Sequence, residues 1–150
     1  MSSYDYDQLA AYVLRARQLI AKHGYTVQPV VTDGRSAPYS YTVGLHTTHG
    51  YELVMVGIDN PVMNGVLHAL VERFTGSAGP DPDERLDGLL ANGYQLRMAP
   101  VPSLEPFSLL RAVYGPDACP PFWQAIWPDP AGHFPDEAGY SLPRKQQMLP

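Results

Sequence analysis

Four residues near the middle of the chain, Tyr41, Thr42, Gly44 and His46, have types and spacing that could serve chemistry. They lie in a stretch that alternates between apolar and polar residues, which predicts a β-strand that ends at the glycine. A histidine at the end of a strand can act as a general base or donate a hydrogen bond to an anionic ligand. The alternative interpretation is a solvated turn over residues 46–50, because that segment is rich in polar turn-forming residues.

A second group of candidate residues lies near the C-terminus, in Trp127-Pro128-Asp129 and Gly132-His133-Phe134-Pro135. Asp129 or His133 could assist His46 in a small hydrolase or transferase, provided that the three side chains converge within hydrogen-bond distance. Trp127 and Phe134 could form the aromatic wall of a ligand pocket. In the simpler interpretation, Asp129 is a turn residue between two prolines and Trp127 is a core anchor.

The residue types and spacings give less support to a metal site, a reactive cysteine or a nucleotide-binding site. His46 and His49 would need a third ligand from His68 or His133, and no zinc-binding spacing occurs, so the sequence supports no metal site. Cys119 lacks the glycines and arginine of a phosphate-binding loop, and we expect it to be a small packing residue before a strand. Neither common nucleotide-binding motif is present, so the cofactor, if there is one, stays unknown.

The motifs as a set resemble the signature of a known family. Tyr-Thr-Val-Gly-Leu at residues 41–45, Trp-Pro-Asp at 127–129 and Gly-x-Phe-Pro at 132–135 are similar to those of a bacterial and phage family catalogued only as a domain of unknown function, family 4262. The resemblance begins at Gly24 and covers most of the chain. It implies a single small domain without an assigned reaction, cofactor or catalytic residue.

Hydrophobic periodicity predicts the elements that must position these residues. Leu9, Val13, Ala16 and Ile20 recur at helical spacing, with Asp5 or Asp7 as the helix cap. Strands are predicted over residues 25–31 and 39–45, joined as a hairpin by a turn at Asp33-Gly34, and over 51–58, 94–101 and 122–127, with 51–58 central. Further helices are predicted over residues 61–74, 86–90 and 107–114.

These elements indicate one α+β domain over residues 1–150, in which a mainly antiparallel sheet packs against about three to four helices. A small split barrel is the alternative architecture. Eight of the sixteen prolines lie at or after Pro116, so we expect an irregular arm over residues 128–150, anchored by Trp127, Phe134 and Tyr140, outside a core over residues 5–127.

Composition bounds the function. The net charge of −5 offers no basic surface, so nucleic acid is not an expected partner, and no apolar run is long enough to span a membrane. A single cysteine fits a reducing compartment, and we expect a cytoplasmic protein.

Three hypotheses remain. The first is a non-enzymatic module that binds a small molecule or a protein partner with the sheet end at residues 41–46 and the aromatic arm. The second is the hydrolase or transferase described above. The third is a flavin-associated protein, because Ser40 to Leu45 loosely resembles a strand of split-barrel flavin reductases. The sequence determines neither the ligand nor the oligomeric state.

Overall fold

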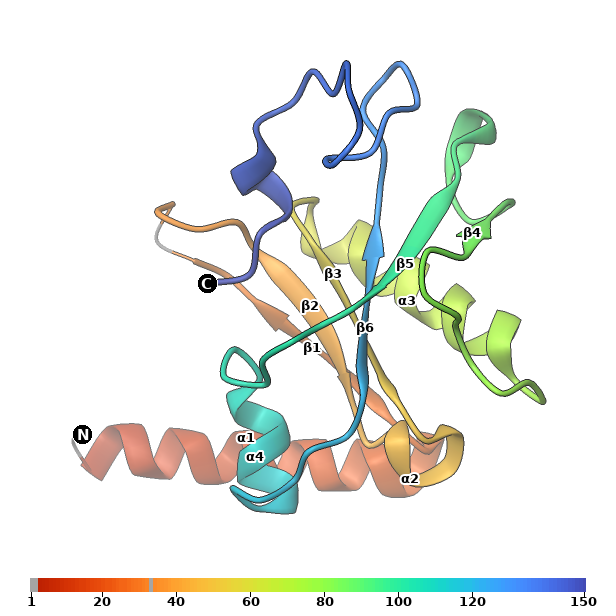
Figure 1. Cartoon of the computed structure of the whole chain (residues 1–150). Helices are drawn as coiled ribbons and strands as arrows, with labels where there is room; N and C mark the ends of the chain where they lie inside the picture. The colour runs from red at the N-terminus through yellow and green to blue at the C-terminus, as the bar shows by residue number, and fades with distance from the viewer. Residues whose placement is uncertain (1–2, 33) are drawn as a thin grey trace.

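The computed structural model describes residues 3–32 and 34–150, with side chains from Asp7 onward. Within these residues, six strands form one sheet in the order β1-β2-β3-β6-β5-β4 (Figure 1). All neighbours are antiparallel except β3 and β6, which pair in parallel. The strands are β1 Thr26–Val30, β2 Tyr39–Val43, β3 Glu52–Val56, β4 Arg85–Leu86, β5 Leu96–Pro100 and β6 Phe122–Ile126.

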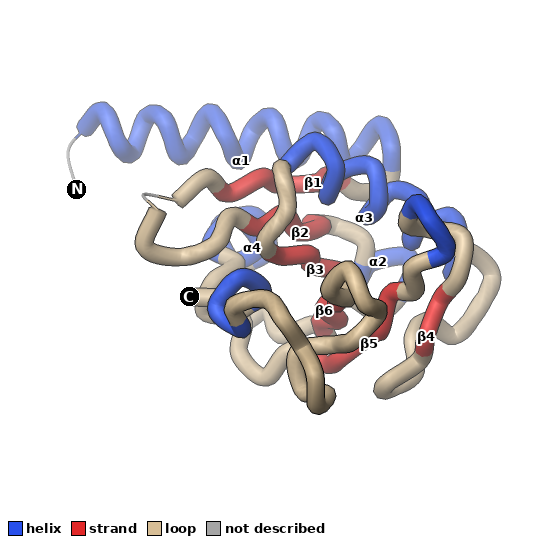
Figure 2. Tube along the Cα trace, turned by 90° about the horizontal axis from the view of Figure 1, so that it is seen from above, coloured by secondary structure: helices blue, strands red, loops and turns tan. Residues whose placement is uncertain are grey.

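In the described part of the chain, four α-helices accompany this sheet, which confirms the predicted α+β class. They are α1 Ser3–His23, α2 His46–His49, α3 Asn60–Phe74 and α4 Ser108–Tyr114, and two 3-10 turns lie at Ala91–Gly93 and Arg144–Gln147. Pro61 occupies the first turn of α3, where a missing N–H costs no hydrogen bond. Figure 2 shows the strands following one another from β1 beside α1 to β4 at the opposite edge.

Alternation along the strands buries a core on each face of the sheet. The α3 face is filled by Leu53 and Met55 of β3 together with the apolar stripe of the helix, which comprises Met63, Val66, Leu67, Leu70, Val71 and Phe74. The other face carries Val54 and Val56, packed with residues of α1 and α4. Because β3 is apolar on both faces, it lies inside the sheet, as its sequence predicts.

The C-terminal segment, residues 128–150, is irregular apart from one 3-10 turn and lies at the end of the sheet opposite α2 (Figure 1). Gln147 fastens it, because its side chain accepts a hydrogen bond from Trp127 N and donates one to Trp127 O. Gln124 donates to the carbonyl of Gln147. This confirms that the proline-rich end of the chain forms no long regular element.

Several local predictions were wrong. The helix predicted over residues 86–90 does not form, because Leu86 joins a short strand opposite Leu96 and Gly88 adopts a positive φ of 80°. Helix α1 begins at Ser3, so Asp7 lies within the helix and does not cap it. The single described sheet is open, with β1 and β4 at its edges, so the split-barrel alternative does not hold.

The turn at residues 46–49 and the exposure of Cys119 also differ from the sequence-based expectation, and the turn at residues 33–34 lies partly outside the described residues. Residues 46–49 form one helical turn and not a simple hairpin loop. The predicted turn at Asp33-Gly34 falls partly on Asp33, which lies outside the described residues. Cys119 precedes β6 as predicted, but it is exposed, so the prediction of a packing residue was wrong.

Candidate functional site

The polar residues at the end of β2 converge on a carboxylate that the sequence analysis missed, that of Glu52. This side chain is completely buried. Its Oε1 accepts hydrogen bonds from the Thr42 hydroxyl at 2.7 Å and Leu45 N at 3.1 Å. Its Oε2 accepts from Gly44 N at 3.0 Å and His46 N at 3.2 Å. The His46 imidazole Nδ1 lies 2.5 Å from the same oxygen.

The turn after β2 creates this arrangement. Gly44 has a φ of 98°, which favours glycine, and it lets three successive N–H groups point at one carboxylate. A Cβ at this glycine would lie 2.9 Å from Ile20. The Thr42 hydroxyl also accepts a hydrogen bond from Leu53 N at 2.8 Å, which connects β2 to β3. Thr42, Gly44 and His46 therefore hold the carboxylate of Glu52 in place.

His46 is oriented by this contact. Its side chain is 21% exposed, and its ring meets Tyr114 edge-on at 4.6 Å between centroids. A carboxylate on one imidazole nitrogen is the arrangement that orients a general base. Tyr41 does not join it, since the Tyr41 hydroxyl accepts a hydrogen bond from Leu109 N and burial raises the pKa of Tyr41 to about 12.

Asp129 forms a second buried carboxylate, with 1% of its surface exposed. Its Oδ1 accepts hydrogen bonds from the N–H groups of Ala131 and His133, and its Oδ2 accepts from the N–H and hydroxyl of Ser141. Burial by itself raises the pKa of Asp129, but these hydrogen bonds outweigh it and lower the pKa to about 2. The His133 ring is close, with its Nδ1 3.7 Å from Oδ2. Asp129 thus organises the loop that contains it.

Phe134 joins the arm to the β5 edge of the sheet. Its ring is buried, and the guanidinium groups of Arg85 and Arg97 each lie 4.9 Å from the ring centroid. The same arginines make ion pairs with the arm, Arg97 with Asp136 at 2.6 Å and Arg85 with Glu137 at 3.2 Å. Trp127 and Phe134, the motif aromatics expected to line a pocket, both hold the arm against the sheet, and Phe134 also borders a small cleft of about 210 Å³.

The two carboxylate centres lie at opposite ends of the sheet. Glu52 and His46 sit at the start of β3, whereas Val56 at its other end accepts a hydrogen bond from the Trp127 indole at 2.7 Å. A strand of this length separates them by about 13 Å. Asp129 follows Trp127 by two residues in the C-terminal segment, which Figure 1 shows at the end of the sheet opposite α2. His46 therefore does not meet Asp129 or His133, and the catalytic convergence required by the hydrolase or transferase hypothesis is absent.

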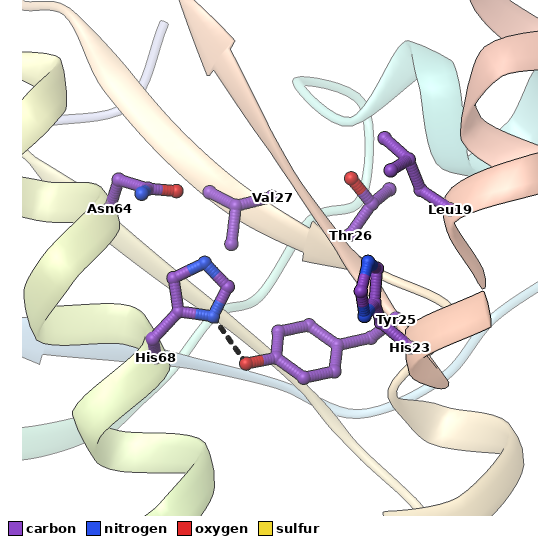
Figure 3. A pocket seen from close by; sticks show the side chains of 7 residues that line it. All are labelled: Leu19, His23, Tyr25, Thr26, Val27, Asn64 and His68. Atoms are coloured by element: carbon purple, nitrogen blue, oxygen red, sulfur yellow. Dashed lines mark hydrogen bonds between the residues drawn. The ribbon is translucent and has the colours of Figure 1, made fainter.

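A cleft of about 460 Å³ opens where the end of α1, the start of β1 and helix α3 come together (Figure 3). The Tyr25 hydroxyl makes a hydrogen bond with His68 Nδ1, and their rings are tilted at 5.4 Å between centroids. Burial raises the pKa of Tyr25, and the negative charge of Glu72 adds to this effect. The cleft is lined by Leu19, His23, Tyr25, Thr26, Val27, Asn64 and His68.

Neither the cleft nor the role of Glu52 was predicted from the sequence, for different reasons. A charged residue that opens an otherwise apolar strand is a detectable signal for Glu52. The cleft has no comparable signal, because its polar residues come from three separate elements. Among the described residues, no group of three or more His, Cys, Asp or Glu side chains could hold a metal ion.

Comparison with known proteins identifies the family. The chain belongs to the family described as "Domain of unknown function (DUF4262)", whose model matches residues 19–141, and this confirms the resemblance seen in the motifs. No curated protein and no solved structure gives a significant match. None of the helices in the described part of the chain is long and apolar enough to cross a membrane.

Proposed function

We propose that this protein is a binding module for a small polar molecule, and that the ligand occupies the cleft between α1, β1 and α3. The observation that carries the proposal is the contrast between this cleft and the two buried carboxylates. Glu52 and Asp129 each accept at least four hydrogen bonds from the protein itself, which satisfies their acceptor capacity. The cleft instead presents polar side chains to an open concave space.

The Tyr25–His68 contact defines what the cleft offers to a ligand. A Tyr25 hydroxyl that donates to Nδ1 leaves the His68 proton on Nε2. Figure 3 shows that this second nitrogen points to the side of the cleft formed by Val27 and Asn64. Asn64 adds an amide that both donates and accepts, and His23 adds a second imidazole. The complementary ligand carries acceptor oxygens beside a small apolar surface.

The size of the cleft supports a small molecule. Ligand sites usually measure about 300 to 1,000 Å³, and this cleft measures about 460 Å³. Leu19 and Val27 supply an apolar wall beside the polar groups. We therefore retain the hypothesis of a non-enzymatic binding module but propose the cleft as the ligand site. The end of β2 and the arm are not proposed, because their polar groups make hydrogen bonds within the protein. An exposed cysteine and an acidic charge support a cytoplasmic setting.

The first test is native mass spectrometry of the protein as purified, followed by a thermal-shift screen with carboxylates, phosphates, nucleosides, amino acids and sugars. We expect one of these classes to raise the melting temperature of the wild type. Tyr25→Phe keeps the shape of the cleft but frees the His68 tautomer. It should weaken binding by up to about tenfold, because without this hydrogen bond part of the His68 population carries its proton on Nδ1 and has none on Nε2 to donate to the ligand.

The matched control is His49→Ala, which removes a half-buried histidine that lies outside the cleft. It should leave binding unchanged, whereas His68→Ala should abolish it. The proposal is wrong if no compound class binds, or if a bound compound keeps its affinity in His68→Ala.

A further inference from the structure

Helix α1 presents an apolar surface that the rest of the described chain does not cover. Three of the six large hydrophobic side chains exposed in the described part of the chain lie on this helix. Leu9 at 39% and Leu14 at 59% border the same groove, whereas Tyr12 at 53% lies about 160° around the helix from Leu14. The helix packs on α4 and β1 through its inner side, where Ala16 is buried. Its N-terminal half extends past the sheet (Figures 1 and 2).

The exposed surface has a groove with a defined shape. A concave space of about 500 Å³ lies along α1 and α4, lined by Leu9, Ala10, Val13, Leu14, Arg17 and Ala112. Small alanines on both sides of the groove allow another backbone to approach closely. Arg17 is positioned beside the groove, because its guanidinium donates a hydrogen bond to the Val113 carbonyl at 3.0 Å.

We propose that this groove is the interface of a homodimer, in which α1 packs against α1 of a second copy in antiparallel orientation. The residue pattern of the helix is complementary to itself in this orientation. Asp7, Ala10, Leu14 and Arg17 follow each other at spacings of three, four and three residues, so they share one stripe of the helix.

A two-fold axis that passes through this stripe midway between Ala10 and Leu14 brings these four positions into matching pairs. Asp7 faces Arg17 of the second copy at both ends of the interface, and Ala10 faces Leu14 in between. Opposite charges therefore meet, and each large side chain lies against a small one. A parallel pair in the same register would place like charges together, and so the charges select the antiparallel arrangement. The interface uses residues 7–17 of α1, whereas the ligand cleft takes only Leu19 and His23 from this helix, so the two sites are separate.

Sedimentation velocity over a range of protein concentrations tests the proposal directly. A single pair of 21-residue helices gives a small interface, so we expect a dissociation constant of about 1 to 100 µM. Leu14→Glu places a charge in the apolar centre and should weaken the dimer at least tenfold. The control, Val31→Glu, changes a side chain that is 83% exposed on another surface and should have no effect.

Charge exchange tests the orientation. Asp7→Arg alone and Arg17→Asp alone each oppose like charges twice, and each should weaken self-association by about fivefold to tenfold. An equimolar mixture of the two variants restores opposite charges at both ends and should associate like the wild type. Arg17→Asp also loses the hydrogen bond to the Val113 carbonyl, so thermal unfolding must show that this variant stays folded. The results for Leu14→Glu and Asp7→Arg do not depend on the Arg17→Asp variant.

Three results would overturn the proposal. The first is a wild-type protein that stays monomeric at several hundred micromolar. The second is a dimer that Leu14→Glu leaves intact. The third is a mixture of the folded charge variants that associates no better than either one alone.

Discussion

Replacing Glu52 by glutamine tests the organisation of the β2 end most sharply. The substitution keeps the volume of the side chain but turns one carboxylate oxygen into an NH₂ group. Each oxygen accepts at least two hydrogen bonds, so at least two donors then face another donor inside the protein. Because these groups are buried, they cannot recover the lost bonds from water.

The expected loss in the free energy of unfolding follows from the buried charge of Glu52 and the donors bound to it. Removing one partner of a buried, hydrogen-bonded charge network costs about 3 to 5 kcal/mol. For a domain of this size, each kcal/mol lowers the melting temperature by about 2 to 4 °C. We therefore expect Glu52→Gln to melt about 10 to 15 °C below the wild type. His46→Ala should cost about 1 to 2 kcal/mol, because the other donors to the carboxylate remain.

The assay is urea unfolding followed by tryptophan fluorescence and circular dichroism, analysed for the free energy of unfolding. Glu105→Gln is the matched control, because Glu105 is exposed and the same chemical change should cost less than about 0.5 kcal/mol there. A loss of less than about 1 kcal/mol in Glu52→Gln would refute the reasoning, since the carboxylate would then not be the centre that holds the turn.

Two further predictions concern the C-terminal arm. The pKa of Asp129 is lowered from 3.8 to about 2 in the folded protein, so its carboxylate stabilises the fold above pH 3.8 and this contribution is lost as the pH falls towards 2. Asp129→Asn should therefore remove part of the acid dependence of the urea midpoint, and an unchanged dependence would contradict the assignment. Gly57→Ala should release the arm, because a Cβ would lie 2.0 Å from the Gln146 carbonyl oxygen, and amide hydrogen exchange at Gln147 should rise. Gly50→Ala has a similar φ of 88° but open space around it, so it should cost only about 1 to 2 kcal/mol and leave the arm protected.

Local patterns determined much of the secondary structure from the sequence. The spacing of Val13, Ala16 and Ile20 predicted α1, and the alternation in residues 39–45 predicted β2, because helix and strand periods are properties of a short segment. The density of prolines predicted the irregular arm, since proline lacks the N–H that regular elements need. The helix predicted over residues 86–90 was wrong because of a contact outside the segment. Its leucine spacing suits a helix, but Leu86 pairs with Leu96 in a strand.

In the candidate site too, a local pattern predicted some residues and the pairing of strands decided the rest. The sequence indicated that Thr42, Gly44 and His46 form a polar group, and the structure brings all three to one place. Their common partner, Glu52, reaches them through the antiparallel pairing of β2 with β3. That pairing depends on strand register, which is set by burial and pairing across the whole sheet.

Only the tertiary structure decided which distant residues meet. It placed His46 and Asp129 at opposite ends of the sheet and brought Tyr25 to His68 across 43 positions in the chain. Contacts of this kind arise when separate elements pack to bury apolar surface, and the free energy of that packing belongs to the whole domain. A residue pattern in one short segment does not determine which distant residues it contacts, so the cleft could be recognised only in the folded chain.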